Sequence, residues 1–389
     1  MTLLVSGDRV SDTLVIDRSL GEGAFAEVHR VRHEYLGWQA MKLFKRVASK
    51  EETVRMLDEA RLLSTLGHPN IVRVFDANTV RTPEGVRGFF TMEYVAGGSL
   101  ERLAAAHKSM VPRDLVAEVV TQIASGLAVA HDQDPPIVHR DVTMANVLVG
   151  YDGTGMRVRV SDFGLAKRAD PFTHLASAQG TYAFMAPEVM RNQGYSCASD
   201  VWSVGVIAYL LLTNRFPFHQ GGEEFSSFSF GRFNRSLLPP SSYNDEVDAE
   251  LDRIVLAMLE LDPQNRPATA QVLGDALRER AEAMAGAGAA AGDSVGGAAA
   301  SGGSAVSAKA AGSAKSAGSA KAAGSARSAV NRPPTQRARR LAEEALELAR
   351  SPGELDRAAD LMEEAVNLSP YLRDLHLSKL TLWRRGVMM

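Results

Sequence analysis

The first part of the chain carries short apolar runs that are divided by glycine-containing turns. Runs of this length, rich in Val, Ile, Trp and Phe, are typical of strands. Residues 51–66 differ, because they place leucine and valine residues at helical spacing among charges, which predicts an amphipathic helix. The chain therefore begins with a small β-rich lobe that holds one helix. The predicted strands are 13–16, 28–31, 38–44, 71–75 and 88–94.

Helical periodicity then takes over. Apolar residues recur at the spacing of one helix face over residues 116–130. Short strands are expected at 147–149 and 158–160, followed by helices as far as Met284. A small β-rich lobe followed by a large α lobe predicts the α+β class with a two-lobed architecture.

The most apolar stretch covers residues 201–212 and includes Ser203 and Tyr209. A helix that crosses a membrane needs about 20 apolar residues, so this stretch is too short. It predicts instead a helix that is buried on all sides within a globular domain. We expect no membrane span.

Residues 285–331 are nearly all Ala, Gly, Ser and Lys, and they contain tandem hexads such as Ala308–Ser313. A period of six fits neither helix nor strand, and the tract has too little apolar surface to offset the entropy of ordering it. We expect a disordered, flexible linker. The evenly spaced lysines leave weak contact with anions as an alternative role.

Residues 335–384 return to helical periodicity, with a break at Ser351-Pro352-Gly353. Ala358, Met362 and Ala365 resemble the second helix of a tetratricopeptide repeat, in which small residues let paired helices approach. Only about one and a half such units fit this length, whereas three or more are usually needed for stability. This helical tail is therefore expected to dock on a partner, to self-associate, or to be only partly folded.

Composition narrows the class of protein. Hydrophobic residues make up 45% and charged residues 23%, as in ordinary globular domains. The net charge is −3, and the linker is basic, so the main domain is acidic, which argues against a nucleic-acid partner. Cys197 is the only cysteine, which excludes an intrachain disulfide. The start of the chain lacks the basic and apolar regions of a signal peptide, and we expect a cytoplasmic protein.

Gly21 and Gly23 lie between two predicted strands. No helix follows them, as a dinucleotide-binding turn requires, and no Gly-Lys-Ser/Thr is present, so a Walker loop is excluded. Two interpretations stay open: an ordinary hairpin, or a hairpin whose backbone N–H groups approach phosphates.

Lys42 lies inside the apolar strand Ala40–Phe44. A buried ammonium needs a partner of opposite charge, and Glu59 of the following helix could supply it. A lysine that extends its charge to the surface is the alternative.

Asp141 and Asn146 come just before a predicted strand, and Asp162 comes just after the next one. Two carboxylates and one amide that converge on one pocket would suit a magnesium–phosphate site, because hard cations prefer oxygen ligands.

With these motifs in order, residues 12–281 resemble a protein-kinase domain, and the pattern is similar to bacterial eukaryotic-like serine/threonine kinases. The resemblance implies the two-lobed kinase fold and phosphoryl transfer from ATP with Mg²⁺ to protein substrates. It implies that Asp141 is the catalytic base, that Lys42 holds the α- and β-phosphates with Glu59 as its ion-pair partner on the helix, and that Asn146 and Asp162 bind the metal. The implied nucleotide-binding residues are Gly21, Gly23, Ala26 (in place of a third glycine), Val28, Ala40, Lys42, Glu93, Val95 and Leu148.

The motifs Gly180-Thr181 and Ala186-Pro187-Glu188 follow the serine/threonine pattern, and Arg266 is expected to pair with Glu188. Thr143 departs from it, because kinases of this class usually place a lysine there. Arg140 implies control through a phosphorylated activation segment.

Thr173 or Ser177 is the expected autophosphorylation site, and a solvated loop with no switching role is the alternative. A nucleotide-binding pseudokinase scaffold and a small-molecule phosphotransferase are the rival functions. The substrates cannot be named from the sequence.

Overall fold

The protein was analysed as a computed structural model. It describes residues 2–23, 26–45, 60–61, 64–107, 110–153, 155–163, 182–219, 230–293, 335–349 and 354–369, with the single positions 372, 376, 379, 380 and 383. The chain divides into two compact units, Met1–Leu277 and Arg278–Met389. Glu59, Thr173, Ser177 and most of the predicted helix 51–66 lie outside the described residues.

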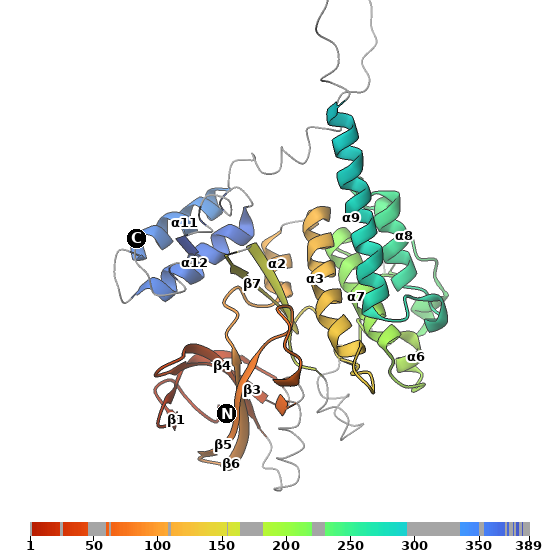
Figure 1. The fold of residues 1–389 in the computed structure, drawn as a ribbon. Coiled ribbons are helices and arrows are strands. Elements are labelled where there is room, and N and C mark those ends of the chain that lie inside the picture. The colour runs from red at the N-terminus through yellow and green to blue at the C-terminus, as the bar shows by residue number, and fades with distance from the viewer. Residues whose placement is uncertain are drawn as a thin grey trace, which may run out of the picture. The chain divides into compact units, whose positions relative to one another are not determined.

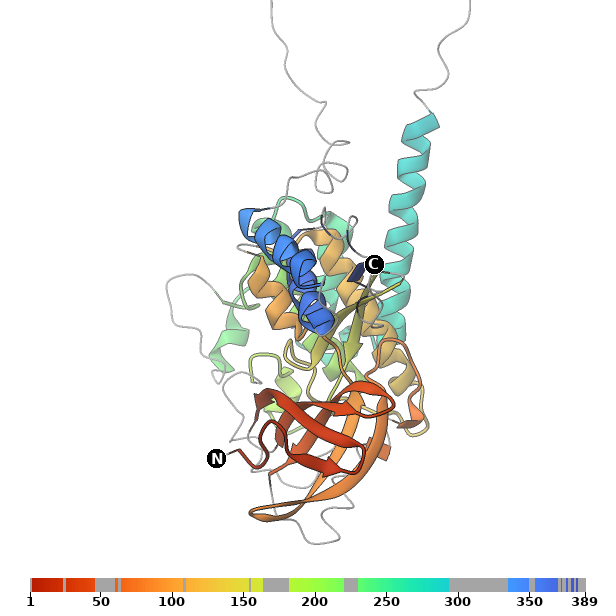
Figure 2. The same cartoon turned by 90° about the vertical axis from the view of Figure 1, so that its left-hand side faces the viewer.

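The small lobe of the first unit is an antiparallel sheet with the strand order β1-β2-β3-β4-β6-β5. Figures 1 and 2 both show its strands, coloured red to orange, gathered apart from the helices of the larger lobe. Its strands are β1 (Arg9–Ser11), β2 (Leu14–Glu22), β3 (Ala26–His33), β4 (Gly37–Phe44), β5 (Val74–Thr82) and β6 (Gly85–Glu93).

The two faces of this sheet bury separate apolar clusters, because successive side chains of a strand point to opposite faces. We call them the outer and the inner face. The outer-face cluster contains Leu3, Leu4, Leu14, Ile16, Val31, Met41, Leu43, Val80 and Phe89. The inner-face cluster contains Ala26, Ala40, Phe44, Ala60, Val72, Phe90, Met92 and Val95.

One predicted strand is misplaced. The apolar run 71–75 predicts a strand, whereas β5 begins only at Val74 and extends to Thr82. Ile71 instead forms an isolated parallel bridge with Val160 of the large lobe, and it is 2% exposed. Ile71 is therefore buried between the two lobes and does not belong to a strand of the small-lobe sheet. Much of β5 is exposed on its surface, so its sequence lacks a clear apolar alternation.

The large lobe is mainly helical and includes a two-stranded sheet, β7–β8. Helix α7 is buried on nearly every side, as the sequence predicted, and it contacts both α3 and α8. The elements are α2 (Leu100–Ala106), α3 (Arg113–His131), β7 (Val147–Asp152), β8 (Gly155–Val160), α6 (Pro187–Met190), α7 (Cys197–Thr213), η2 (Phe230–Asn234), η3 (Pro240–Ser242), α8 (Ala249–Met258), η4 (Pro263–Asn265) and α9 (Ala270–Asp293).

Helix α9 is longer than expected, because it continues to Asp293 and overlaps the start of the linker predicted over 285–331. Alanine has the highest helix propensity, so an alanine-rich continuation of a packed helix can stay helical without burial. The remainder of the predicted linker lies outside the described residues.

The helical tail contains α11 (Gln336–Leu348) and α12 (Leu355–Leu368), which pack against each other. Their contact uses small residues: Ala342 and Ala345 of the first helix and Ala358 of the second are at most 3% exposed. Arg337 and Glu364 add an ion pair of 2.9 Å between the helices. This arrangement agrees with the expected helical hairpin, while its resemblance to a tetratricopeptide repeat stays a prediction.

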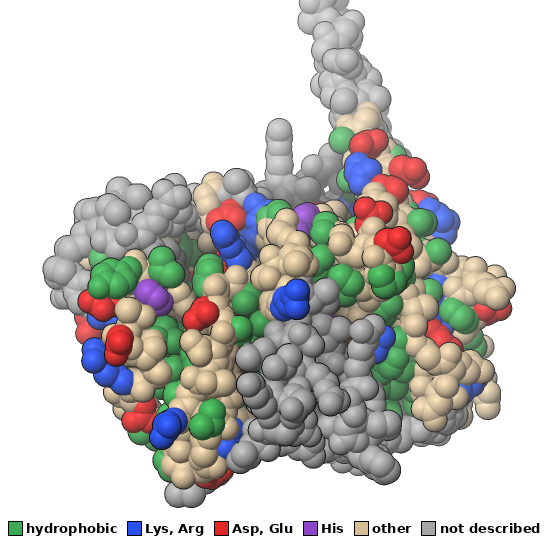
Figure 3. Space-filling model, turned by 60° about the horizontal axis from the view of Figure 1, so that its bottom comes forward, with side chains coloured by type: hydrophobic (Ala, Val, Ile, Leu, Met, Phe, Trp, Pro, Cys, Tyr) green, Lys and Arg blue, Asp and Glu red, His purple; other side chains and the backbone are tan. Residues whose placement is uncertain are grey.

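Among the described residues, no helix combines the length and apolar character that crossing a membrane requires. On the face drawn in Figure 3, the coloured acidic and basic side chains are interspersed.

Candidate active site

Lys42 lies on β4 between β3 and β6, where it pairs with Val28 and Phe90. Its Nζ is 2.9 Å from Oδ1 of Asp162, and the side chains are 14% and 29% exposed. The ammonium therefore points into the space between the lobes, which excludes the alternative of a lysine extended to the surface. The structure brings together two of the predicted site residues that are 120 positions apart.

Asp162 adopts a left-handed backbone conformation, with φ of 56°. This strained geometry is uncommon for a residue other than glycine and is often found at functional sites. The next side chain, Phe163, is fully buried, and its ring lies 4.4 Å from that of His139. The buried phenyl ring therefore anchors the backbone that follows β8, and with it the position of Asp162.

Asn146 and Asp141 form a second pair of predicted site residues that the structure brings together. Its Nδ2 donates to the backbone oxygen of Asp141 at 2.9 Å and to Oδ2 of Asp141 at 3.0 Å. The backbone N–H and the hydroxyl of Ser161 both donate to the Asn146 carbonyl, at 2.8 and 2.9 Å. Ser161 directly precedes Asp162, so these bonds hold Asp141, Asn146 and Asp162 in one framework.

This donor set suits a magnesium ion. The amide nitrogen of Asn146 is engaged with Asp141, so the oxygen is the atom left to face a cation, and Asp162 adds a carboxylate. Hard cations prefer such oxygen ligands. Asn146 and Asp162 therefore fit the expected metal and would supply it with two oxygen ligands.

His139 links the backbone at Asp141 to the backbone just before Asp162. Its Nδ1 accepts the Asp141 N–H at 3.2 Å, and its Nε2 donates to the Ser161 carbonyl at 2.9 Å. Burial lowers the pKa of this imidazole, against the weaker opposing effect of Asp200. A neutral His139 with its proton on Nε2 satisfies both contacts.

Asp200, at the start of α7, anchors the same segment. Its carboxylate accepts the N–H groups of His139 and Arg140 at 2.7 and 2.9 Å, and Nε2 of His131 donates to it at 3.0 Å. The His131 Nδ1 in turn accepts the N–H of Ala270 at 3.1 Å. The sequence did not reveal His131, which lies at the end of α3 with no local motif.

The glycine-containing loop connects β2 and β3. Gly21 pairs with Val28, and the Gly23 N–H donates to the Ala26 carbonyl at 2.8 Å. A Cβ built on Gly21 would meet nothing within 4 Å, so packing inside the chain does not require glycine there. A glycine there leaves the backbone uncovered, as the predicted approach of a phosphate would need. The tip, residues 24–25, lies outside the described residues.

Four of the residues predicted to bind the nucleotide lie on the inner face. Ala40 and Val95 are buried there, and Val28 and Leu148 are partly buried against the same cluster. Glu93, which is also predicted to bind the nucleotide, forms a 2.9 Å ion pair with Arg159 of β8. Arg159 was not singled out in the sequence, because a charged residue at an alternating strand position usually faces solvent.

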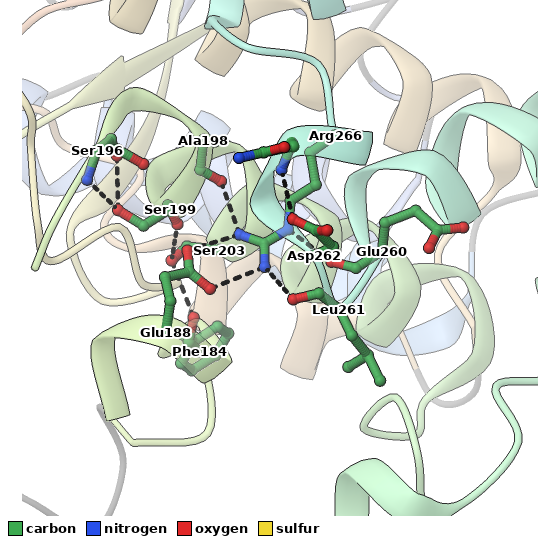
Figure 4. A network of polar contacts seen from close by, with 11 residues as sticks. Phe184, Glu188, Ser196, Ala198, Ser199, Ser203, Glu260, Leu261, Asp262 and Arg266 are labelled. Atoms are coloured by element: carbon green, nitrogen blue, oxygen red, sulfur yellow. Dashed lines mark hydrogen bonds and ion pairs between the residues drawn. The ribbon is translucent and has the colours of Figure 1, made fainter. Parts of the chain in front are cut away.

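Glu188 and Arg266 form the expected pair behind the site, shown in Figure 4. Two guanidinium nitrogens of Arg266 lie 2.7 and 2.8 Å from the two carboxylate oxygens of Glu188. Arg266 also donates to the carbonyls of Glu260, Leu261 and Ala198. This buried bidentate pair joins the short helix α6 to the residue that follows η4, and the bond to Ala198 links both to the start of α7.

A small pocket adjoins Asp141. It is lined by Arg140, Asp141, Thr143, Phe184, Met185 and Tyr195, among other residues. Thr143, which stands where a lysine was expected, is 7% exposed and contributes to this wall. Burial raises the pKa of Tyr195 to about 12, so the phenol stays neutral at physiological pH.

Known proteins resemble this chain over the same region. The family model for the protein kinase domain matches residues 14–277. The serine/threonine-protein kinase PknB of Mycobacterium tuberculosis is 30% identical over 274 residues, which cover 69% of this chain and 42% of PknB. The serine/threonine-protein kinase Pkn1 of Myxococcus xanthus is 34% identical over 268 residues, which cover 67% and 37% of the two chains. The chain thus spans less than half the length of either relative.

The chain is also similar to a solved structure of a kinase domain. The crystal structure of the Mycobacterium tuberculosis PknI kinase domain matches with a TM-score of 0.52 and 25% identity, covering 71% of this chain and 99% of that one. The shared region includes both lobes.

Proposed function

This chain belongs to the protein kinase family, and from that membership we propose that it is a serine/threonine protein kinase. It transfers the γ-phosphoryl group of Mg-ATP to serine or threonine hydroxyls of protein substrates. The relatives that carry this name, PknB and Pkn1, support the choice of acceptor.

The observation that carries the proposal is the convergence of two pairs. Lys42 contacts Asp162 at 2.9 Å, and Asn146 contacts Asp141 at 3.0 Å, with Ser161 linking the pairs. One cation, two carboxylates and one amide oxygen at the junction of two lobes suit phosphoryl transfer, in which catalysis is mainly positioning and charge stabilisation.

We assign the roles as follows. Asp141 accepts the proton of the acceptor hydroxyl, and Asn146 orients its carboxylate by donating to Oδ2. Lys42 holds the α- and β-phosphates and exchanges its contact with Asp162 for them when nucleotide enters. Asn146 and Asp162 hold the magnesium ion, which, when bound, neutralises charge on the transferred group.

Glu59, as the expected partner of Lys42, keeps its role as a proposal and lies outside the described residues. The backbone around Gly21, Gly23 and Ala26 covers the phosphates, while Val28, Ala40 and Leu148 enclose the adenine. Backbone groups of Glu93 and Val95 bind its edge.

A pseudokinase scaffold is disfavoured, because such a chain would normally lack Lys42, Asp141 or Asp162, and all three are present here. The cytoplasm, where Mg-ATP is available, is the proposed compartment. Autophosphorylation at Thr173 or Ser177 and a partner or a second copy bound through the helical tail are further parts of the proposal.

Transfer of radiolabel from [γ-³²P]ATP to a generic basic protein tests the function. Phosphoamino-acid analysis should find label on serine or threonine with the wild type, and the signal should require Mg²⁺. Label on neither residue, with the protein folded and Mg-ATP bound, would refute the proposed activity. Intact-mass measurement of the kinase after the same incubation tests autophosphorylation.

A further inference from the structure

Residues 2–8, which we call the N-terminal strap, cover part of the outer face of the small-lobe sheet. Leu3 and Leu4 are 6% and 5% exposed and belong to the outer-face cluster. Val5, the next residue, is 59% exposed, so the apolar contact is confined to the two leucines. The strap thus lies on the side of the sheet opposite the predicted nucleotide pocket.

A buried polar contact fixes the strap to β3. The Leu3 N–H donates to both carboxylate oxygens of Glu27, at 3.0 and 3.2 Å. Glu27 is 1% exposed, and Nε2 of His29, which is fully buried, donates to the same carboxylate at 3.0 Å. A buried carboxylate is stable only when donors of this kind satisfy it, so the strap completes the environment of Glu27.

The strap is also bonded to β2. The Gly7 N–H donates to the Ile16 carbonyl at 2.9 Å, and the Ile16 N–H donates to the Asp8 carbonyl at 2.9 Å. The Val5 N–H donates to Oδ2 of Asp8 at 2.8 Å, which closes a turn within the strap. The strap therefore bridges β2 and β3, the two strands that flank the glycine-containing loop.

Glu27 is well placed to transmit this restraint. It pairs with Glu22 at the base of the loop, and its neighbours Ala26 and Val28 belong to the inner face. Because side chains alternate along a strand, a shift of Glu27 on the outer face moves both neighbours on the nucleotide side.

From these contacts we propose that the N-terminal strap is a positioning element for the nucleotide loop and that Glu27 is its positioning residue. The inference rests on the proposed kinase function, because it names how the same site holds its nucleotide loop in the binding conformation. When the strap is released, β3 and the loop sample other conformations. If only about one fifth of the molecules keep the loop in its nucleotide-binding conformation, the apparent Kd for Mg-ATP rises about fivefold.

Two kinds of variant test this. Glu27→Gln keeps the side-chain shape and removes the charge, whereas Leu3→Ala/Leu4→Ala removes the apolar anchor without touching the strands. Val5→Ala is the matched control within the strap. For each variant, we would measure binding of a non-hydrolysable Mg-ATP analogue, and hydrogen exchange of the backbone amides over residues 20–28 without nucleotide. Both are measured at a temperature at which circular dichroism shows the chain folded.

For Glu27→Gln and for Leu3→Ala/Leu4→Ala, we expect the Kd for the nucleotide analogue to rise about fivefold and the loop amides to exchange faster. Val5→Ala should leave both quantities unchanged. Combining the two changes should add little, because they release the same element. Wild-type affinity and wild-type loop exchange in a strap variant of reduced thermal stability would overturn the inference and leave only a structural role. If the double-alanine variant does not fold, Glu27→Gln decides alone. Failure of the wild type to bind the analogue would count against the proposed function, whereas the exchange measurement tests the strap without nucleotide.

Discussion

The buried pair of Arg266 and Glu188 provides a sharp test of how the large lobe is held together (Figure 4). Their side chains are 0% and 9% exposed, and Arg266 has carbonyl partners in addition to the bidentate contact. Replacing Arg266 by Met leaves the Glu188 carboxylate buried without its cation. Loss of one member of a buried pair costs about 3–5 kcal/mol. We therefore expect Arg266→Met to lower the free energy of unfolding by that amount.

The chain offers a matched control. Arg253 and Glu250 form a pair of similar length, 2.6 Å, but their side chains are 61% and 46% exposed. Exposed pairs contribute only about 0–1 kcal/mol, so Arg253→Met should have little effect. Urea unfolding of the full chain, followed by far-ultraviolet circular dichroism, measures both variants.

Equal costs for Arg266→Met and Arg253→Met would show that neither burial nor the carbonyl contacts of Arg266 raise the cost of losing this pair. A second change sharpens the test. Replacing Glu188 by Leu in the Arg266→Met background removes the unpaired charge, and exchanging a whole buried pair for apolar residues is often close to neutral. The double variant should therefore be more stable than Arg266→Met alone.

Three further outcomes are expected. Gly126→Ala should destabilise the chain by about 1–3 kcal/mol, because its Cβ would lie 2.6 Å from the Asn70 carbonyl oxygen, whereas Gly274→Ala, with 4.0 Å to its nearest atom, should be neutral or stabilising by chemical denaturation. Burial lowers the pKa of His139. As the pH falls, the imidazole is therefore protonated in the unfolded chain before it is protonated in the folded chain. Stability from His139 is present above about pH 6.5 and falls below it by up to about 1.4 kcal/mol per pH unit; His139→Gln should flatten this slope in urea titrations. Lys42→Met should lower the phosphate-transfer rate by about a hundredfold or more in a radiolabel assay at saturating ATP, and a rate within threefold of wild type would contradict its role.

Much of the architecture could be predicted because it depends on local patterns. The uniformly apolar sequence of α7 indicated a helix buried on all sides, and this is confirmed. An isolated lysine in an apolar strand indicated a buried cation, and Lys42 does contact a carboxylate. The catalytic and metal-binding roles of Asp141, Asn146 and Asp162 stay predictions, although their positions are close together.

Other features escaped prediction because they depend on contacts between distant segments. Ile71 looked like part of a strand, but its partner is Val160 of the other lobe. The burial of Glu27 follows from the strap folding back over β3, which nothing in the local sequence indicated. His131 likewise gains its role only when α3 is brought beside Asp200.

Asp141 is proposed to act as a base on the acceptor hydroxyl, within a site that binds Mg-ATP independently of it. Single-turnover phosphate transfer, measured with wild type and Asp141→Asn after confirming that each binds Mg-ATP, tests it most directly. We expect Asp141→Asn to bind the nucleotide with an affinity similar to that of the wild type and to transfer phosphate about 10²–10⁴-fold more slowly. Transfer at the wild-type rate by Asp141→Asn would contradict the proposed role.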